Sequence, residues 1–247
     1  MPTLALVLSG VLQSWGTTTI GHARATNAYP TKSAVIGLIA NALGRDRMDN
    51  IADLATLSYG VRVDSPGIVQ RDYHTVSIIT QPTKGDRINR VTERFYLADA
   101  VFLVTLNHSD EKLVNSIADA LKKPSRALFL GRKSCPPNRP IFHSVSDSSL
   151  ESVLSETSWQ VDNATKNAYK DSTVTLDIFR DPVDSQEALD ADPVSDQPVS
   201  FNPDARRYAS RAVHQTSTTI PVDSPAEPDV LLPPMMLLAM RAAGAVA

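Results

Sequence analysis

The sequence of 247 residues contains one cysteine, so no internal disulfide can form. It also opens without the charged, apolar and small-residue leader that marks a secreted protein. These two absences argue against a secreted, disulfide-stabilised protein, and we expect a cytoplasmic one. The length corresponds to one or two domains of roughly 100–200 residues each, and 42 % hydrophobic residues suffice to bury a core.

Two common kinds of functional site are missing as well. The five histidines are scattered, and no two stand at the spacing of metal ligands, so a zinc site is unsupported. A nucleotide-binding P-loop needs glycine immediately before its lysine and again five residues earlier. Thr31 and Thr26 hold those positions before Lys32. We therefore expect neither an NTPase nor a bound cofactor or metal.

A large net charge is also absent, but the small total hides a division of the chain. The formal net charge is −3, whereas residues 1–145 carry 17 basic and 11 acidic side chains and residues 146–247 carry 7 basic and 16 acidic ones. A basic half with an acidic appendage is a hint of a polyanion-binding face. On charge alone, two solvated halves are the simpler explanation.

The hydrophobic pattern of residues 1–145 predicts a strand, a helix, two strands joined by a turn, a further strand, a helix and a last short strand, which corresponds to the order β-α-β-β-α-β when the two joined strands are counted together. One helix begins at Pro30-Thr31 and stops at Gly44, and a second is capped by Ser109 and ends at Pro124. This order is typical of an α+β, ferredoxin-like domain, in which helices cover one face of an antiparallel sheet and the other face is free to bind. The predicted strands are 3–8, 59–63, 68–79, 95–106 and 127–130.

The pattern is weaker in residues 146–247, which we expect to form a smaller, strand-rich C-terminal part. Strands are predicted over 172–179 and 208–213. The acidic, proline-bearing segment 181–203 has few large apolar residues and is predicted to be a mobile loop. The apolar tail 230–247 is too short and too broken to span a bilayer, so we expect it to pack on the core or on a partner, and we expect no membrane contact.

Three polar segments of the basic half have the residues needed to bind RNA. The loop 130–137 carries Arg132, Lys133 and Ser134 after a glycine, and arginine with lysine neutralises phosphates. Thr31, Lys32 and Ser33 stand at a helix start, where free amides favour an anion. In the third segment, Gln13, Trp15 and Arg24 offer an amide, an aromatic ring and a cation, which is the usual combination for binding unpaired bases. A solvated turn, ordinary helix capping and a core tryptophan are the respective alternatives.

One further segment and one cluster complete the candidates. Residues 80–94 lose their apolar side chains and gain cations, including Lys84, Arg87 and Arg90, so we expect an exposed basic excursion. Arg71-Asp72-Tyr73-His74 is the only dense cluster of titratable groups, and His74 is a candidate general base for metal-free RNA cleavage. A hydrogen-bonded strand histidine or a plain RNA contact accounts for it more simply.

Taken together, these segments resemble the CasD family, the subunit of the type I-E CRISPR surveillance complex Cascade that holds the 5′ handle of the guide RNA. The matching motifs run in family order and cover most of the chain. They are Gly10-Val11-Leu12-Gln13-Ser14-Trp15-Gly16, Arg24-Ala25-Thr26 leading into Pro30-Thr31-Lys32-Ser33 and Gly37-Leu38, Arg71-Asp72-Tyr73-His74-Thr75-Val76, Tyr96-Leu97-Ala98-Asp99-Ala100-Val101-Phe102, Leu130-Gly131-Arg132-Lys133-Ser134-Cys135-Pro136 and Tyr208-Ala209-Ser210-Arg211.

The resemblance implies an RNA-recognition-type domain with a β-hairpin thumb at about 77–93, and a non-catalytic subunit that binds the 5′ handle of the crRNA and caps the filament of backbone subunits. Its implied partners are the crRNA, the backbone subunit, the large subunit and, through the complex, target DNA. A metal-independent endoribonuclease that processes precursor crRNA is the main alternative. The implied RNA contacts are Gln13, Trp15, Arg24, Thr31, Lys32, Ser33, Arg71, His74, Arg132, Lys133 and Ser134, with Lys84, Arg87 and Arg90 on the thumb.

Overall fold

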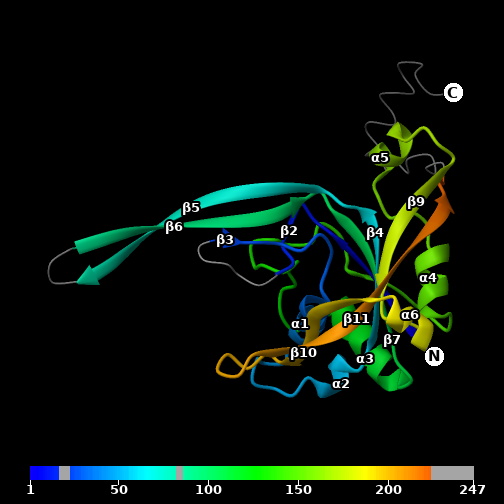
Figure 1. Ribbon diagram of the computed structural model, residues 1–247, viewed down its shortest axis with the longest axis horizontal. Helices are drawn as coiled ribbons and strands as arrows, with labels where there is room; N and C mark the ends of the chain where they lie inside the picture. The colour runs from blue at the N-terminus through cyan, green and yellow to red at the C-terminus, as the bar shows by residue number, and fades with distance from the viewer. Residues whose placement is uncertain (17–22, 82–85, 224–247) are drawn as a thin grey trace, which may run out of the picture.

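The computed structural model describes residues 1–16, 23–81 and 86–223 of the chain. Its centre is a seven-stranded sheet in the order β10-β11-β9-β4-β7-β1-β8 (Figure 1). The N-terminal half contributes four adjacent antiparallel strands, β4 (Ser58–Ser65), β7 (Val101–Asn107), β1 (Thr3–Ser9) and β8 (Phe142–Ser146). The chain is therefore a mixed α+β protein, as the sequence predicted.

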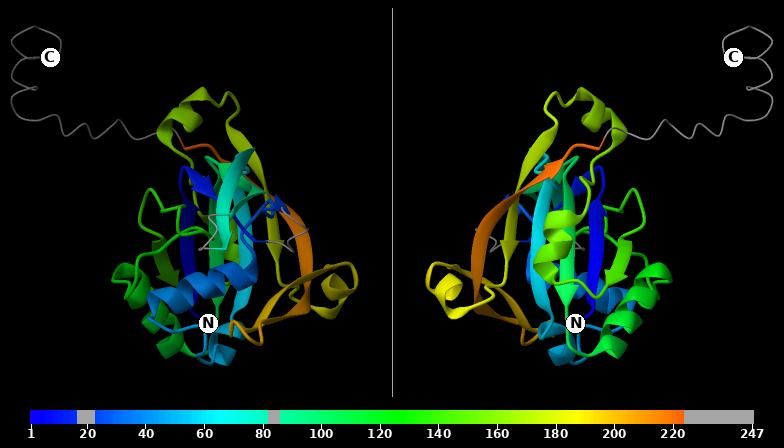
Figure 2. Two further views of the ribbon diagram at one scale, coloured as in Figure 1. Left: turned by 90° about the vertical axis from the view of Figure 1, so that its left-hand side faces the viewer. Right: turned by 90° about the vertical axis from the view of Figure 1, so that its right-hand side faces the viewer.

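The core lies on both faces of this sheet because β1 is buried over its whole length and its central residues are apolar. Leu4, Leu6 and Leu8 face a cluster that includes α1 (Lys32–Ala42) and α3 (Glu111–Lys122). Ala5 and Val7 face α4 (Leu150–Glu156) on the other side. Figure 2 shows the two faces, with α1 in front of the sheet in the left view and α4 in front in the right view.

The two predicted helices form close to their predicted ends. The side chain of Thr31 accepts a hydrogen bond from the amide of Ala34 and so caps α1, and Gly44, at a φ of 77°, follows the end of that helix. Asp110, not Ser109, caps α3, because its carboxylate accepts from the amides of Lys112 and Leu113. The predicted cap of α3 was thus wrong by one residue.

Two predicted strands differ from the structure. Residues 95–106 are not one strand, because β6 (Asp86–Ala98) ends before Asp99, whose φ of 56° turns the chain into β7. Residues 127–130 form no strand, and β8 provides the edge of the sheet instead. The apolar side chain of Leu130 is buried all the same, since it anchors the loop that follows.

A long hairpin of β5 (Ile68–Gln81) and β6 projects from the body of the protein (Figure 1). We call it the projecting hairpin. The thumb that the resemblance implied at about 77–93 corresponds to the outer part of this longer hairpin. At its base, the short strands β2 (Leu12–Gln13) and β3 (Ala23–Arg24) pair with β6, antiparallel and parallel respectively.

The segment predicted as an acidic loop, 181–203, contains α6 (Ser185–Leu189) and the strand β10 (Asp192–Ser200). That prediction was wrong because the acidic side chains neutralise buried arginines: Glu187 pairs with Arg180, and Asp196 with Arg211. The strand β10 pairs with β11 (Arg207–Pro221), which pairs with β9 (Thr173–Arg180), and β9 joins β4. The apolar tail 230–247 lies outside the described residues.

The remaining helices are short, namely α2 (Ala52–Ala55) and α5 (Asn163–Ala168). Among the helices in the described ranges, none has the length and apolar character needed to cross a membrane.

Candidate nucleic-acid interface

The loop that carries Arg132 and Lys133 packs against the loop after β1, so two of the predicted RNA-binding segments lie together. The amide of Ser14 donates to the carbonyl oxygen of Leu130 at 3.1 Å. Gly131 has a φ of 83°, and a Cβ at this position would stand 1.8 Å from the carbonyl oxygen of Ser14. Only glycine allows this approach, and it fixes where the following side chains begin.

Arg132 is held at the base of the projecting hairpin. Its guanidinium lies over the ring of Tyr96, 4.6 Å from the ring centroid, and Nη2 donates to the carbonyl oxygen of Arg24 at 3.1 Å. The Nη1 group is buried without a hydrogen-bond partner in the described part of the chain. Lys133 and Ser134 are exposed beside it. The ring of Tyr96 and the bond to Arg24 thus fix the cation of half-buried Arg132 at the hairpin base, beside exposed Lys133, where the two positive charges attract phosphate.

Two more arginines come from the strands next to this loop. Exposed Arg24 on β3 stands in register with Arg94 on β6. The Nε of half-buried Arg94 also has no hydrogen-bond partner within the described residues. Sequence reasoning placed Arg94 at the end of the basic excursion without selecting it as a contact, and it assigned the stacking residue Tyr96 to an apolar strand. Their role depends on the pairing of β3 with β6, which no local pattern reveals.

An apolar pocket of about 380 Å³ opens on the other face of the hairpin base. Val69, Phe95 and Leu97 come from β5 and β6, on the face opposite to Tyr96, because side chains alternate along a strand. The loop after β3 closes the opposite wall with residues 25–28. The base of the hairpin therefore offers a cationic face and an apolar pocket back to back.

The Arg71-Asp72-Tyr73-His74 cluster is divided between these two faces. The Nε2 atom of His74 contacts the carboxylate of Asp72 on one face. Exposed Tyr73 points to the opposite face, as does Arg71, which lies 3.6 Å from Glu93. Tyr73 is thus not available to assist His74 in an acid–base step.

Two of the predicted contacts are core residues. The side-chain amide of Gln13 donates to the carbonyl oxygen of Ala100 at 2.6 Å, and Gln13 and Trp15 are both 0 % exposed. Trp15 belongs to the main apolar cluster, and its backbone pairs with Thr26 and Asn27. These residues hold the loop after β1 in place. Trp15 is therefore a core tryptophan, the alternative to an RNA contact that the sequence left open.

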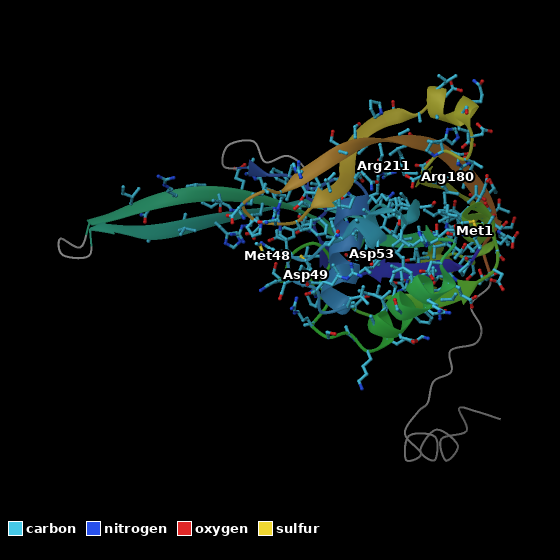
Figure 3. The ribbon with its side chains drawn as sticks, turned by 90° about the horizontal axis from the view of Figure 1, so that it is seen from below. Met1, Met48, Asp49, Asp53, Arg180 and Arg211 are labelled. Carbon is cyan, nitrogen blue, oxygen red and sulfur yellow. The ribbon has the colours of Figure 1, made fainter. Side chains whose placement is uncertain are left out.

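At the start of α1, where the sequence predicted that a ligand phosphate binds, the structure places a carboxylate of the protein, that of Asp196. The amide of Lys32 donates to Oδ2 of Asp196 at 2.8 Å, and the Nζ atom of Lys32 lies 3.4 Å from Asp181. Arg211, which is labelled in Figure 3, donates to both carboxylates, at 2.6 Å each. Thr31 and Lys32 are buried and Ser33 is half-buried. A phosphate at this helix start would have to displace Asp196.

Burial and charge act in opposite directions in this group. Burial lowers the pKa of the Lys32 ammonium, while the carboxylate of Asp181 raises it. Two cations and two carboxylates meet there, so the group is balanced in charge. Sequence reasoning missed the arrangement because Asp181 and Asp196 were assigned to a solvated loop.

The outer part of the projecting hairpin carries Arg90, which is exposed. Lys84 lies outside the described residues, and so does the side chain of Arg87. Within the described ranges, no group of three or more histidine, cysteine, aspartate or glutamate side chains is arranged to hold a metal ion.

The fold and the site define a mixed α+β protein with a curved, strand-rich sheet, a projecting hairpin and an arginine-bearing loop at the base of that hairpin. Residues 3–214 match the family model described as CRISPR-associated protein (Cas_Cas5). The chain belongs to the Cas5 family of CRISPR-associated proteins.

Individual relatives agree with this assignment. The chain is 34 % identical over 157 residues to the CRISPR system Cascade subunit CasD of Escherichia coli (strain K12), a match that covers 56 % of this chain and 69 % of the relative. It is also similar to a chain in a structure of a CRISPR RNA-guided surveillance complex, with a TM-score of 0.73, 30 % identity and coverage of 92 % and 95 % of the two chains. A crystal structure of a Cas protein matches with a TM-score of 0.68 and 32 % identity, over 90 % of this chain and 100 % of the other.

Proposed function

We propose that the protein is a non-catalytic RNA-binding subunit of a CRISPR RNA-guided surveillance complex, in which it holds the 5′ handle of the crRNA and caps the filament of backbone subunits. The observation that carries the proposal is the cluster of cations at the hairpin base, in which Arg132, oriented by Tyr96 and by the carbonyl oxygen of Arg24, lies next to exposed Lys133 and Arg24. The similarity to a Cascade subunit and to a chain of an RNA-guided complex supports the same role.

The two faces of the hairpin base suit the two parts of a nucleotide. Arg132, Lys133 and Arg24 neutralise phosphates, each contact adding salt-sensitive affinity. The apolar pocket beside Phe95 has the size and lining to take a base that has left the stack. This division assigns the phosphates to one face and a base to the other.

We assign these RNA contacts to residues 1–145, which we propose form a ferredoxin-like domain. The strand order β4-β7-β1-β8 supports this fold assignment. The second, smaller part is residues 146–247, and its described residues 146–223 support the first part from the side, through β9 and through the contacts of Asp181 and Asp196 at α1. The projecting hairpin, as a thumb, reaches the neighbouring backbone subunit. The large subunit and the target DNA are met through the assembled complex.

Binding of the purified chain to a labelled crRNA at several salt concentrations tests the proposal. Arg132→Ala and Lys133→Ala are each expected to weaken binding and to reduce the salt slope by about 0.7–0.9 per lost phosphate contact. Lys112→Ala and Lys123→Ala, at exposed positions on and just after α3, are the matched controls and are expected to bind as the unmodified chain does. Unchanged affinity and slope in both loop variants would contradict the assignment.

The contact between His74 and Asp72 keeps a metal-independent endoribonuclease as the second candidate. Incubation with precursor crRNA in EDTA distinguishes the two functions. We expect no cleavage and retained binding. Specific cleavage that His74→Ala abolishes would favour the enzyme instead.

A further inference from the structure

The turn between β10 and β11 is a cationic site in the acidic half of the chain. Arg206 ends this turn, Arg207 and Tyr208 begin β11, and all three are exposed, with 44 % of Tyr208 accessible. The other two arginines described in this half, Arg180 and Arg211, have side chains that are at most 8 % exposed and that form ion pairs with carboxylates. Among the described residues of this half, the exposed arginines are therefore concentrated at the turn and the start of β11.

The turn is held firmly on the body of the protein. Arg211 fixes β11 to Asp181 and Asp196. Phe201 packs against α1, where a Cβ at Gly37 would stand 3.7 Å from its ring. The amide of Asp204 donates to the side chain of Asn202 at 2.9 Å and closes the turn. A positioned turn loses little freedom when it binds, which favours affinity.

The turn also faces the same way as the candidate site. In Figure 1 the β10–β11 turn extends toward the side from which the projecting hairpin leaves the body, and the left view of Figure 2, which looks onto that side, has α1 between them. A strand of nucleic acid held at the base of the projecting hairpin can continue along this side to the turn.

We propose that Arg206, Arg207 and Tyr208 form a second contact for single-stranded RNA, separate from the Arg132 loop. Arg207 and Tyr208, as neighbours on β11, point to opposite faces of the strand, and Arg206 precedes it, so the strand of RNA passes the end of this hairpin. The arginines neutralise its phosphates and the ring of Tyr208 stacks on one base, a combination typical of single-strand binding sites. RNA fits better than a protein partner because the site offers two cations and one ring in place of a broad apolar patch. The proposal rests on the proposed function, since it extends the path of the same RNA.

Titrating the full chain with a labelled crRNA, and with an unstructured oligouridine, tests this second contact. The double variant Arg206→Ala/Arg207→Ala is expected to weaken binding of both probes about tenfold and to lower the salt slope by about 1.4, two contacts at roughly 0.7 each on a single strand. Tyr208→Ala is expected to cost about fivefold or more, whereas Tyr208→Phe retains the ring and the affinity. Thermal unfolding of each variant verifies the fold.

The controls separate this inference from the proposed function. The double variant Lys112→Ala/Lys123→Ala removes the same charge from the α3 region and is expected to bind normally. If Arg132→Ala weakens binding but the turn variants do not, the second contact is wrong and the proposed function stands. If the unmodified chain binds no RNA, both are wrong. Turn variants that keep their RNA affinity but fail to join neighbouring subunits would make the turn a protein contact and overturn the inference.

Discussion

Arg62 and Asp64 face each other inside the protein, two residues apart on β4, and both side chains are 0 % exposed. Nε and Nη2 of the arginine donate to the two carboxylate oxygens at 2.7 and 2.9 Å. The guanidinium also donates to the carbonyl oxygens of Leu154, Thr157 and Ser158, and the carboxylate accepts from the amide of Gln160. The pair thus fastens the segment after α4 to the middle of the sheet.

Removing one member of this pair is expected to destabilise the protein strongly. Asp64→Ala leaves the Arg62 charge buried and without its carboxylate, at a cost of about 3–5 kcal/mol in the free energy of unfolding. Urea denaturation measures the loss. The control is Asp46→Ala at the exposed Asp46–Arg126 pair, where the cost is at most about 1 kcal/mol. Equal losses in the two variants would contradict the role assigned to the buried pair.

Gly131→Ala is expected to disrupt the loop that carries Arg132. The new Cβ would overlap the carbonyl oxygen of Ser14, so the loop has to move in addition to bearing the left-handed φ. Gly44→Ala is the matched control, since its φ of 77° is similar and its nearest contact is the side chain of Ser125 at 3.1 Å. Gly44→Ala is expected to cost about 1–2 kcal/mol, because an L-residue is disfavoured in the left-handed conformation, and Gly131→Ala more, with loss of RNA affinity. Urea denaturation and RNA titration of both variants measure the difference.

Acid is expected to weaken the link between α6 and β9. The hydrogen bonds from Arg180 are the main reason that the pKa of Glu187 falls from 4.5 to about 2, with the amide of Val183 contributing. A lowered carboxyl pKa contributes stability that is complete above the ordinary value and is lost as the pH falls toward the lowered one. The loss from Glu187 should therefore occur between about pH 4.5 and pH 2.

Glu187→Gln is expected to be less stable at neutral pH and to lose less stability over that acidic range. Exposed Glu156→Gln provides the control and should follow the unmodified chain. Thermal unfolding across the pH series measures the slopes. Parallel curves for Glu187→Gln and the unmodified chain would show that this pair does not carry the acid sensitivity.

Asp196→Ala is expected to open the start of α1. It leaves the amide of Lys32 and the guanidinium of Arg211 without their shared acceptor, at a cost of about 2–4 kcal/mol. Inorganic phosphate is expected to raise the melting temperature of this variant more than that of the unmodified chain, because the vacated helix terminus binds anions. Exposed Asp192→Ala, on the same strand, should show neither effect.

The sequence predicted those parts of the fold that depend on local pattern. β1 and α1 appear where a short apolar run and a helical period with a cap and a glycine stop require them. The break at Asp99 was missed because its causes are distant in the chain: the amide of Asp99 donates to Val11, and its carbonyl oxygen accepts from Ser65. Because Val11 and Ser65 both lie outside 95–106, the residue pattern of that segment could not indicate either hydrogen bond.

Local pattern also indicated part of the candidate site. Arg132 and Lys133 could be selected from their glycine-bearing loop, and the side chain of Arg24, which was selected as well, is exposed. The side chains of Trp15 and Lys32 are buried instead, because the ring completes the apolar core and the ammonium meets Asp181. Whether a tryptophan or a lysine is buried depends on which strands pack over it, and for Lys32 those strands come from the other half of the chain.

The hydrogen bond between the amide of Lys32 and Asp196 joins residues that are 164 positions apart. During synthesis at about 5–20 residues per second, the start of α1 therefore waits roughly ten to thirty seconds for its acceptor to leave the ribosome. The central strand β4 waits for β9 in the same way. The nascent N-terminal half has to remain unaggregated through that interval. Because β4 pairs with a strand that is synthesised much later, the rate of chain elongation limits the last folding step.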